Sequence, residues 1–349
     1  MTNIRSYSLE ELETVFKNWQ DPVYHAKQVF SWVHQRGVSS FDAMSDLSLA
    51  LRKKLKEYFS LKHLALVKVR ESSEGTKKFL FQLEDGNVIE SVLIPAEGRN
   101  TACVSSQVGC KYACGFCASG LLGFKRNLEV WEILAQLLEI NCSMRREGMG
   151  KITHIVFMGT GEPLDNYENV FKAIRIINSR EGLHIGARRI TISTSGVIPG
   201  IERLAKEGLQ IELSVSLHGA DDETRTQLMP INKKYPLKAL ISACRRYAAL
   251  TKRQVTFEYV LIKGVNCSLE AADNIVKLLK GWNAKVNLLV YNPVKEFLYE
   301  PVNKGEVLRF KQALEKGGLV VTLRKPRGQD IEGACGQLRA RYEKRGATS

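Results

Sequence analysis

The sequence has no apolar run approaching the roughly 18 residues that a membrane-spanning helix needs. Residues 1–5 lead into charged sequence rather than into the apolar core of a secretory signal. No basic segment with a continuous apolar face stands out, which argues against attachment to a lipid surface. We therefore expect a cytoplasmic protein that does not enter a membrane.

The sequence also lacks the second pair of closely spaced cysteines that a structural zinc site or a fully ligated ferredoxin-type cluster uses. Instead it has Cys110, Cys114 and Cys117 at the spacing C-x3-C-x2-C. Three thiolates can hold three irons of a four-iron cluster and leave the fourth open to a substrate or cofactor. Two alternatives are disfavoured by this spacing. One is a zinc site completed by His154 or His218, and the other is three isolated buried cysteines.

Acidic residues are in deficit, because 51 Lys and Arg against 37 Asp and Glu give a formal charge of +14. Such an excess is typical of proteins that neutralise a phosphate backbone, so we expect RNA or DNA as a partner. The eight cysteines occur in a chain without an evident secretory signal, and they indicate metal or redox chemistry rather than a disulfide framework.

The pattern of apolar and polar residues divides the chain into zones. Residues 9–64 carry apolar side chains at helical spacing, and these basic helices either bind nucleic acid or only pack on the main domain. Residues 76–81 and 88–95 alternate like two strands that turn at 84–87. The domains that we expect are a helical RNA-binding accessory domain at 1–66, a β extension at 67–98, a barrel core at 99–340 and a basic tail at 341–349.

From residue 101 onward, strand-like and helix-like segments alternate. The predicted strands are 101–108, 152–158, 189–195, 211–217, 255–262, 286–291 and 319–323, and the predicted helices include 169–177, 237–250, 269–282 and 306–315. This alternation implies an α/β fold with a parallel sheet and right-handed crossovers. Six or seven units instead of eight predict an incomplete barrel, with its chemistry at the carboxyl ends of the strands.

Polar residues follow several of these strands. After the second strand, Gly161 lets the backbone approach a ligand and Glu162 can accept a hydrogen bond from an ammonium group. Ser193, His218 and Asn292 follow later strands, where such groups can hold ribose hydroxyls and a carboxylate. Capping of the next helix is the alternative for any one of these positions.

Two further cysteines lie near the same predicted edge. Cys103 precedes the cysteine triplet, and Cys335 stands in a Gly-rich loop after the last strand, which should return to the barrel mouth. A thiol there can serve as a nucleophile or a redox partner, whereas a buried inert cysteine is the alternative.

Together these motifs resemble the radical S-adenosylmethionine (SAM) superfamily and, within it, the bacterial dual-specificity RNA adenine-C2 methyltransferases. The resemblance rests on the cysteine triplet with Phe116 before its third member, and on Gly-Glu-Pro-Leu-Asp-Asn, Ile-Ser-Thr-Ser-Gly, Ser-Leu-His, Met-Pro-Ile-Asn-Lys-Lys-Tyr and Ala-Cys-Gly-Gln-Leu. It extends from the N-terminal helices to about Gln337. Thr160 is a small departure from the family's Gly-Gly-Glu-Pro pattern.

The resemblance implies a partial (β/α)6 TIM-like barrel with one [4Fe-4S] cluster on Cys110, Cys114 and Cys117, and two SAM molecules per turnover. It implies methylation of C2 of adenine 2503 in 23S rRNA and of adenine 37 in a subset of tRNAs. By the same resemblance, the SAM ligands are Gly161, Glu162, Ser193, Ser216, Leu217, His218 and Asn292.

The resemblance also assigns catalytic roles. Cys335 carries an S-methylcysteine intermediate, Cys103 resolves the protein-RNA adduct through a transient disulfide with Cys335, and Glu90 accepts the C2 proton. It implies an external electron donor such as flavodoxin, and we expect a monomer because the protein must engage large RNA.

Two other functions remain as alternatives, namely C8 methylation of the same rRNA adenine and a non-catalytic iron-sulfur RNA-binding protein. The second would need the cluster but neither Cys335 nor the Gly-Glu-Pro motif. From clustering alone, the candidate RNA contacts are Lys125, Arg126, Arg188, Arg189, Lys233, Lys234, Arg324, Lys325 and Arg327.

Overall fold

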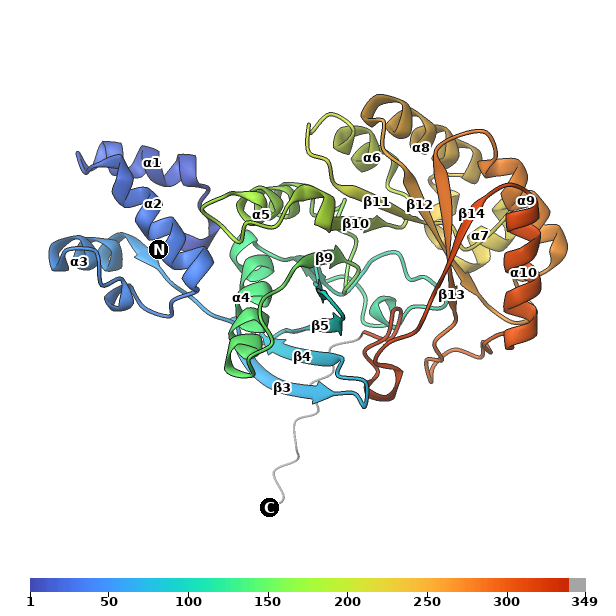
Figure 1. Ribbon diagram of the computed structural model, residues 1–349, viewed down its shortest axis with the longest axis horizontal. Helices are drawn as coiled ribbons and strands as arrows, with labels where there is room; N and C mark the ends of the chain where they lie inside the picture. The colour runs from blue at the N-terminus through green and yellow to red at the C-terminus, as the bar shows by residue number, and fades with distance from the viewer. Residues whose placement is uncertain (339–349) are drawn as a thin grey trace, which may run out of the picture.

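A continuous sheet of ten strands forms the centre of the fold, in the order β14-β13-β12-β11-β10-β9-β6-β5-β4-β3 (Figure 1). The structure is a computed structural model that describes residues 1–338. Within that range, seven strands run parallel, β6 and β9 to β14, and six crossover helices join them. The predicted α/β fold and the incomplete (β/α)6 barrel are therefore confirmed.

The parallel strands are β6 Arg99–Cys103, β9 His154–Phe157, β10 Ile190–Thr194, β11 Glu212–Ser216, β12 Val255–Leu261, β13 Ala284–Val290 and β14 Val320–Arg324. The crossover helices are α4 Val130–Arg146, α5 Tyr167–Asn178, α6 Ile198–Leu204, α8 Leu237–Thr251, α9 Leu269–Leu279 and α10 Lys304–Lys316. A further short helix, α7 Asp222–Leu228, lies between β11 and α8.

Burial and capping explain why these segments form. β12 is buried at all seven positions, as expected for a parallel strand with helices on one face and the barrel interior on the other. Ser268 caps the start of α9, while Asn303 and Glu306 form a capping box at the start of α10. No helix in residues 1–338 is both long enough and apolar enough to cross a bilayer.

The barrel does not close. β14 is one edge of the sheet, and on the other side of the barrel β6 pairs with the antiparallel strand β5. The chain that follows β14 lies between these two sides, where it forms a pocket wall with residues of β5 (Figure 1). This placement brings the Gly-rich loop with Cys335 into the gap of the open barrel.

An antiparallel extension continues the sheet, with β3 Ala65–Glu71, β4 Lys77–Gln82 and β5 Val88–Ala96. The predicted hairpin is confirmed, since β4 pairs antiparallel with β5 from Gln82 opposite Val88 onward. In the turn between them, the backbone N–H of Asn87 donates to Asp85 Oδ1 at 3.0 Å. Sequence patterning did not identify β3, because this strand lies at the sheet edge with every residue exposed and thus carries no burial signal.

The N-terminal zone is helical as predicted, with α1 Leu9–Asn18, α2 Val23–Ser31 and α3 Leu49–Tyr58 (Figure 1). A short parallel pair, β1 Thr2–Asn3 and β2 Phe59–Ser60, holds its ends together. This zone packs beside α4 and α5, where Lys172 forms an ion pair with Glu11 at 2.7 Å. The residues 339–349, which include the predicted tail and the last two positions of the predicted core, lie outside the described residues.

The first predicted core strand, 101–108, is broken in the structure. β6 ends at Cys103, and only Gln107–Val108 forms a second short strand, β7. Between them, the N–H of Ser105 donates to Gln136 Oε1 at 2.8 Å and the N–H of Ser106 donates to the Thr160 carbonyl at 2.9 Å. Hydrogen bonds to α4 and to the loop after β9 thus replace the sheet ladder. Likewise, α9 ends at Leu279 rather than at the predicted residue 282.

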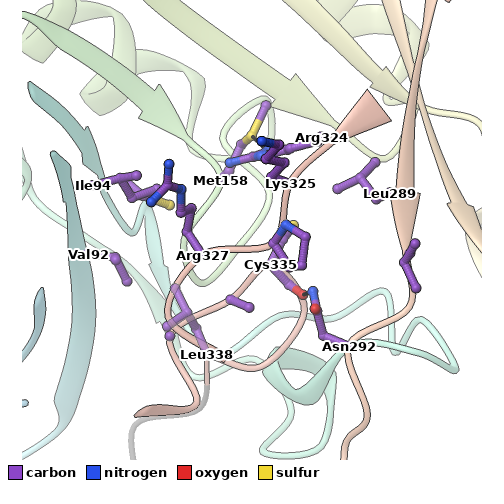
Figure 2. Close-up of a pocket in the computed structure, with 15 residues that line it drawn as sticks. Val92, Ile94, Met158, Leu289, Asn292, Arg324, Lys325, Arg327, Cys335 and Leu338 are labelled. Atoms are coloured by element: carbon purple, nitrogen blue, oxygen red, sulfur yellow. Dashed lines mark hydrogen bonds between the residues drawn. The ribbon is translucent and has the colours of Figure 1, made fainter. Parts of the chain in front are cut away.

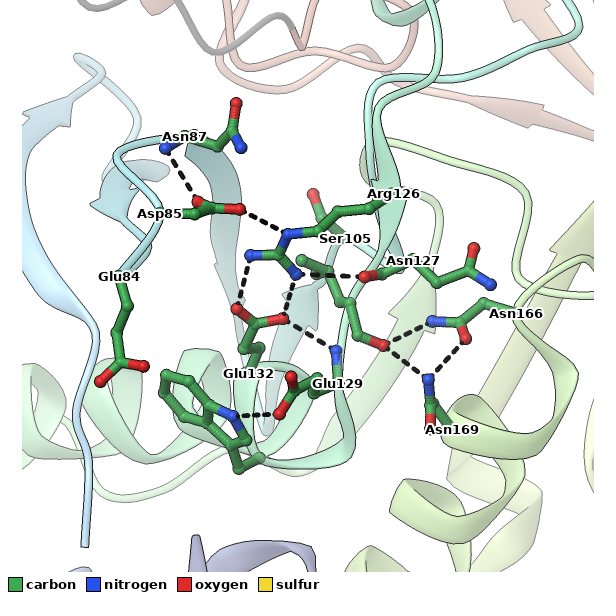
Figure 3. A network of polar contacts seen from close by, with 12 residues as sticks. Glu84, Asp85, Asn87, Ser105, Arg126, Asn127, Glu129, Glu132, Asn166 and Asn169 are labelled. Carbon is green, nitrogen blue, oxygen red and sulfur yellow. Dashed lines mark hydrogen bonds and ion pairs between the residues drawn. The ribbon is translucent and has the colours of Figure 1, made fainter. Parts of the chain in front are cut away.

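A polar network fixes the chain that leaves the cysteine loop (Figure 3). Arg126 forms ion pairs with Asp85 at 2.6 Å and with Glu132 at 2.7 Å, and Glu132 also accepts from the N–H of Glu129 at the start of α4. Asn166 donates to the carbonyls of Ser106 and Leu128, both at 2.8 Å. The network joins the β4–β5 hairpin, the cysteine loop and α4.

Candidate active site

The three clustered cysteines lie on one loop between β7 and β8, the latter being Arg126–Asn127. Cys110, Cys114 and Cys117 line a cavity of about 150 Å³, which we call the cysteine cavity. The N–H of Gly115 donates to the Leu228 carbonyl at 2.9 Å and ties the loop to α7. The cavity lies at the carboxyl ends of the parallel strands, where residues that follow β9, β10, β11 and β13 contribute to its wall.

Burial raises the pKa of all three thiols, to about 12 for Cys110 and well above the ordinary value for Cys114. The negative charge of neighbouring thiolates raises the pKa of both further. A cationic metal group would reverse this effect, because it binds and stabilises thiolates. Three thiols on one loop fit a group with several iron atoms, each of which takes one thiolate.

The zinc alternative gains no support from the histidines. In residues 1–338, no three His, Cys, Asp or Glu side chains are arranged to hold a single metal ion. His154 begins β9, so it lies at the opposite end of the barrel from the cysteine loop. His218 does line the cysteine cavity, but its Nδ1 accepts a hydrogen bond from the N–H of Val260 at 3.0 Å.

Glu162 is a buried carboxylate in the wall of the cysteine cavity. It accepts hydrogen bonds from the N–H and the hydroxyl of Ser195, both at 2.7 Å, and from the N–H of Leu164 at 3.0 Å. Burial nevertheless raises its pKa to about 6. A Cβ at Gly161, where φ is +107°, would stand 2.5 Å from Gln107. The tight turn therefore requires glycine. It places in the wall of the cysteine cavity a carboxylate that forms no ion pair within residues 1–338.

His218 is neutral at physiological pH. Burial, with a smaller effect of the Arg225 charge, lowers its pKa to about 3. Because Nδ1 is an acceptor, the proton is on Nε2, which can donate. The ring packs edge-on against Phe116 at 4.7 Å, and its backbone has the left-handed φ of +54°. A histidine held in this way can donate a hydrogen bond to a neutral or anionic ligand atom.

Cys103 and Cys335 line one small cavity of about 40 Å³, which we call the Cys335 cavity (Figure 2). Cys335 also lines the cysteine cavity, and neither thiol forms a disulfide in this structure. Burial raises the pKa of Cys103 to about 12 and the nearby Cys335 raises it further, whereas Arg324 lowers it. Cys335 is exposed as a residue, but the protein around its sulfur removes water from the thiol and so raises its pKa. The charge of Arg324 lowers the pKa of Cys335 in turn. Both thiols therefore stay protonated at neutral pH until a base removes the proton.

The loop that carries Cys335 is held on three sides. Asn292, at the end of β13, donates to the Cys335 carbonyl at 2.9 Å (Figure 2). The N–H of Ala118 donates to the Gly336 carbonyl at 2.7 Å, and the hydroxyl of Ser119 donates to the Leu338 carbonyl at 2.8 Å. The cysteine loop and the Cys335 loop therefore support each other directly.

Glu90 lies on β5 in a buried ion pair with Lys78 of β4, at 3.0 Å. Lys78 Nζ also donates to the Glu332 carbonyl at 3.1 Å, which anchors the loop before Cys335. Glu90 shares a strand face with Val92, at alternate positions of β5, and Val92 lines the Cys335 cavity. The pair therefore lies beside that cavity but does not line it.

The comparisons with known proteins match this geometry. Residues 104–276 match the Radical SAM superfamily, and residues 2–61 match the ribosomal RNA large subunit methyltransferase N-terminal domain. The chain is 47% identical over 345 residues to the "Probable dual-specificity RNA methyltransferase RlmN" of Thermoanaerobacter sp., covering 99% of each chain. The chain belongs to the RlmN family of radical SAM RNA methyltransferases.

Other RlmN relatives support the same conclusion. The protein of that description from Dictyoglomus turgidum is 46% identical, over 99% of this chain and 98% of its own. A crystal structure of a radical SAM methyltransferase from Sphaerobacter thermophilus has a TM-score of 0.94 and 43% identity, covering 98% of this chain and 100% of that one. The family and fold that the motifs predicted are confirmed, and with them RNA methylation as the activity of the family.

The structure does not gather every predicted residue. Leu217 is fully buried outside the cysteine cavity, and its N–H donates to the Glu258 carbonyl at 3.0 Å. Among the candidate RNA contacts, Arg126 is occupied by the two carboxylates described above, and Arg327 pairs with Glu74 at 3.0 Å. Eleven predicted residues do line the cysteine cavity: Cys110, Cys114, Cys117, Gly161, Glu162, Ser193, Ser216, His218, Asn292, Cys335 and the candidate RNA contact Arg324.

Sequence reasoning missed two residues that support this RlmN-type site. Arg225 is fully buried in α7 and donates to Asn232 Oδ1 and to the Ser195 carbonyl, both at 2.7 Å, so it joins α7 to the end of β10. Gln107 accepts from the N–H of Glu162 at 2.8 Å. No local pattern could have found these roles, because Ser195 lies 30 residues from Arg225 and Glu162 lies 55 residues from Gln107.

Proposed function

We propose that this chain methylates C2 of adenine in RNA, namely adenine 2503 of 23S rRNA and adenine 37 of a subset of tRNAs, by way of an S-methyl group on Cys335. One observation carries the proposal. Cys335 lines both the cysteine cavity and the cavity that it shares with Cys103. The Cys335 thiol therefore lies between the proposed cofactor site and the Cys103 thiol. Adenine C2 has no electron pair for a polar methyl transfer, and a carrier thiol beside a radical site offers another route.

Family membership implies SAM and a [4Fe-4S] cluster, which we propose to be one cluster on Cys110, Cys114 and Cys117 with two SAM molecules per turnover. When bound, the cluster supplies the electron that cleaves SAM and begins the radical chemistry. For SAM we propose that Glu162 accepts from the ammonium group and that Ser193, Ser216, His218, Asn292 and the backbone of Gly161 and Leu217 hold the rest.

The proposed steps on the protein use three side chains. The Cys335 thiolate first attacks a SAM methyl group, so that a new S–CH3 bond forms and S-adenosylhomocysteine leaves. A 5′-deoxyadenosyl radical from a second SAM molecule would later take a hydrogen atom from this methyl group, and the resulting carbon radical joins adenine C2. The adduct radical would give one electron to the oxidised cluster, and Glu90 accepts the C2 proton. The Cys103 thiolate then attacks the Cys335 sulfur and forms a disulfide, while the released carbon keeps the electron pair of the broken S–C bond and takes up a proton to become the methyl group of the product.

The remaining proposals concern partners and organisation. An external electron donor such as flavodoxin would reduce the cluster, the Cys103–Cys335 disulfide would be reduced between turnovers, and the chain would act as a cytoplasmic monomer. We also propose that residues 1–66 form the RNA-binding accessory domain, 67–98 the β extension and 99–340 the core. Support comes from the matched N-terminal domain and from β3 to β5, which continue the barrel sheet.

Nucleoside mass spectrometry tests the proposal. Cluster-reconstituted protein, a reductant and methyl-labelled SAM are incubated with unmodified 23S rRNA and, separately, with tRNA transcripts. We expect labelled 2-methyladenosine in both digests. Label only in 8-methyladenosine would show the C8 reaction instead, and no labelled adenosine from a protein with an intact cluster would contradict catalysis.

The proposed role of Glu162 predicts that SAM affinity depends on pH. Only the ionised carboxylate attracts an ammonium group, and the pKa of Glu162 without ligand is about 6. We therefore expect the Kd for SAM to be constant above about pH 7 and to rise below pH 6 by about tenfold per unit, until the lower pKa of the complex is reached. Calorimetry from pH 5 to 8 measures this dependence.

The matched variant is Glu162→Gln, which keeps the size of the side chain and one oxygen that can accept from Ser195, but has no charge. It should bind SAM more weakly at pH 8 and show a flat profile across the same range. An unchanged slope in this variant would assign the pH dependence to another group and remove Glu162 from the ammonium site.

A further inference from the structure

A second large cavity occupies the opposite, amino-terminal end of the barrel. It measures about 520 Å³ and is lined by residues from all seven parallel strands or their entrances; we call it the basal cavity. In complete barrels the interior is filled by bulky apolar side chains. Here many of the side chains that line the interior are polar, namely Thr101, Thr191, Ser214, Thr256, Asn287 and Thr322.

Five cationic side chains line the basal cavity: Arg99, Arg188, Arg189, Lys285 and Arg324. Across residues 1–338, none of these five side chains forms an ion pair, whereas Arg203 and Arg246 on the outer surface pair with glutamates. The positive charges also lower the pKa of neighbouring basic groups. The pKa of Arg99 is lowered by burial and by the Arg324 charge, and the pKa of His154 is lowered by burial, Arg99 and Arg189.

The two carboxylates in the wall offset only part of this charge. Glu212 forms an ion pair with Arg253, which lies outside the cavity lining. Glu258 accepts hydrogen bonds from Asn287 at 2.9 Å and from Ser214 at 3.3 Å. Burial raises the pKa of Glu258, while the charges of Arg324 and Lys285 lower it, so this one carboxylate faces two of the five cations. Like charges held together in this way are costly in the free protein and favour the binding of an anion.

The basal cavity leads to Cys335. Met158 and Arg324 line the basal cavity, the cysteine cavity and the Cys335 cavity alike, and Ile94 lines two of the three. Figure 2 shows Met158 and Arg324 close to each other above Cys335, with Ile94 farther to the left. A ligand whose charged part stays among the exposed arginines at the mouth, Arg99, Arg188 and Arg189, can therefore direct its uncharged part toward the thiol.

We infer that the basal cavity admits the target nucleotide of the RNA, with its phosphates against Arg99, Arg188, Arg189 and Lys285 and its base directed past Met158 toward Cys335. The inference rests on the proposed function, because it assumes that Cys335 acts on an RNA base. The volume lies within the range of about 300–1,000 Å³ that ligand pockets occupy. Phosphate contacts also help to offset the free-energy cost of unstacking a base. RNA and SAM would then approach Cys335 from opposite ends of the barrel.

The first test removes charge at the mouth with the double variant Arg99→Gln/Arg189→Gln. Binding is measured by fluorescence anisotropy with a labelled transcript of the 23S rRNA segment that holds the target adenine, over a salt series. We expect the Kd to rise at least tenfold, and the slope of log Kobs against log salt to fall by roughly 0.7 for each lost phosphate contact. The control Arg309→Gln/Lys316→Gln on α10 removes two exposed positive charges and should change the Kd less than twofold.

The second test narrows the mouth without changing charge. Ala96→Trp places a bulky side chain at an exposed lining position. The rate of RNA methylation should fall at least tenfold, whereas methylation of Cys335 by SAM, followed by protein mass spectrometry, should stay within twofold because SAM uses the other end of the barrel. Both variants behaving like the α10 control would overturn the basal route. A wild-type protein that binds this RNA but methylates neither Cys335 nor RNA would instead overturn the proposed function.

Discussion

Replacing Cys335 by alanine is expected to abolish methyl transfer to RNA, with a loss of roughly 10⁴-fold or more, as for other covalent nucleophiles. The reason is chemical, because adenine C2 cannot take a methyl group directly. Within residues 1–338, the other thiols that line the cysteine cavity are the three loop cysteines that we propose as cluster ligands. Labelled methyl groups in RNA are counted after anaerobic incubation, and intact-protein mass spectrometry checks that the variant no longer gains a methyl group.

A matched control separates chemistry from folding. Cys267, before α9, lines none of the cavities described above, and Cys267→Ala should keep full activity and one transferable methyl group. Cys335→Ala should still take up iron on its three loop cysteines. If this variant with an intact cluster methylated RNA at even a tenth of the normal rate, Cys335 would not be the methyl carrier.

Lys78→Met is expected to lower the free energy of unfolding more than any other substitution proposed for this chain. The side chains of Lys78 and Glu90 are 8% and 5% exposed, so the variant breaks a buried ion pair. Breaking such a pair costs about 3–5 kcal/mol, measured as a lower midpoint of urea unfolding. The loop before Cys335 also loses its hydrogen bond from Lys78 to Glu332. Activity should fall as well, because a buried carboxyl group without its cation tends to be protonated and then cannot accept a proton.

Two further variants isolate the cause. Lys77 is the neighbouring lysine on β4, and its partners Glu71 and Glu147 are 56% and 39% exposed, so Lys77→Met should cost clearly less than Lys78→Met. The double variant Lys78→Met/Glu90→Gln should recover most of the stability but not the methylation of RNA. Recovery of full activity in the double variant would show that Glu90 is not the proton acceptor.

The sequence by itself determined the fold class and most residues of the site. Strand-helix alternation over more than two hundred residues can be satisfied only by a parallel sheet with crossovers, and parallel strands place their carboxyl ends at one edge. That rule was enough to predict that Cys110, Glu162, His218 and Asn292 meet, and in the structure they line one cavity. The spacing of the cysteine triplet is local, so no tertiary information was needed to find it.

Only the tertiary structure decided which residues support these side chains. The buried pairing of Lys78 with Glu90 depends on the register of β4 against β5, and Arg225 reaches the end of β10 only because α7 folds back over the sheet. The basal cavity depends on which side of each strand faces inward, and a sequence of alternating polar residues does not say whether that side meets solvent or the barrel interior. These positions depend on burial between segments that are far apart in the sequence. Such burial exists only when the whole sheet has assembled.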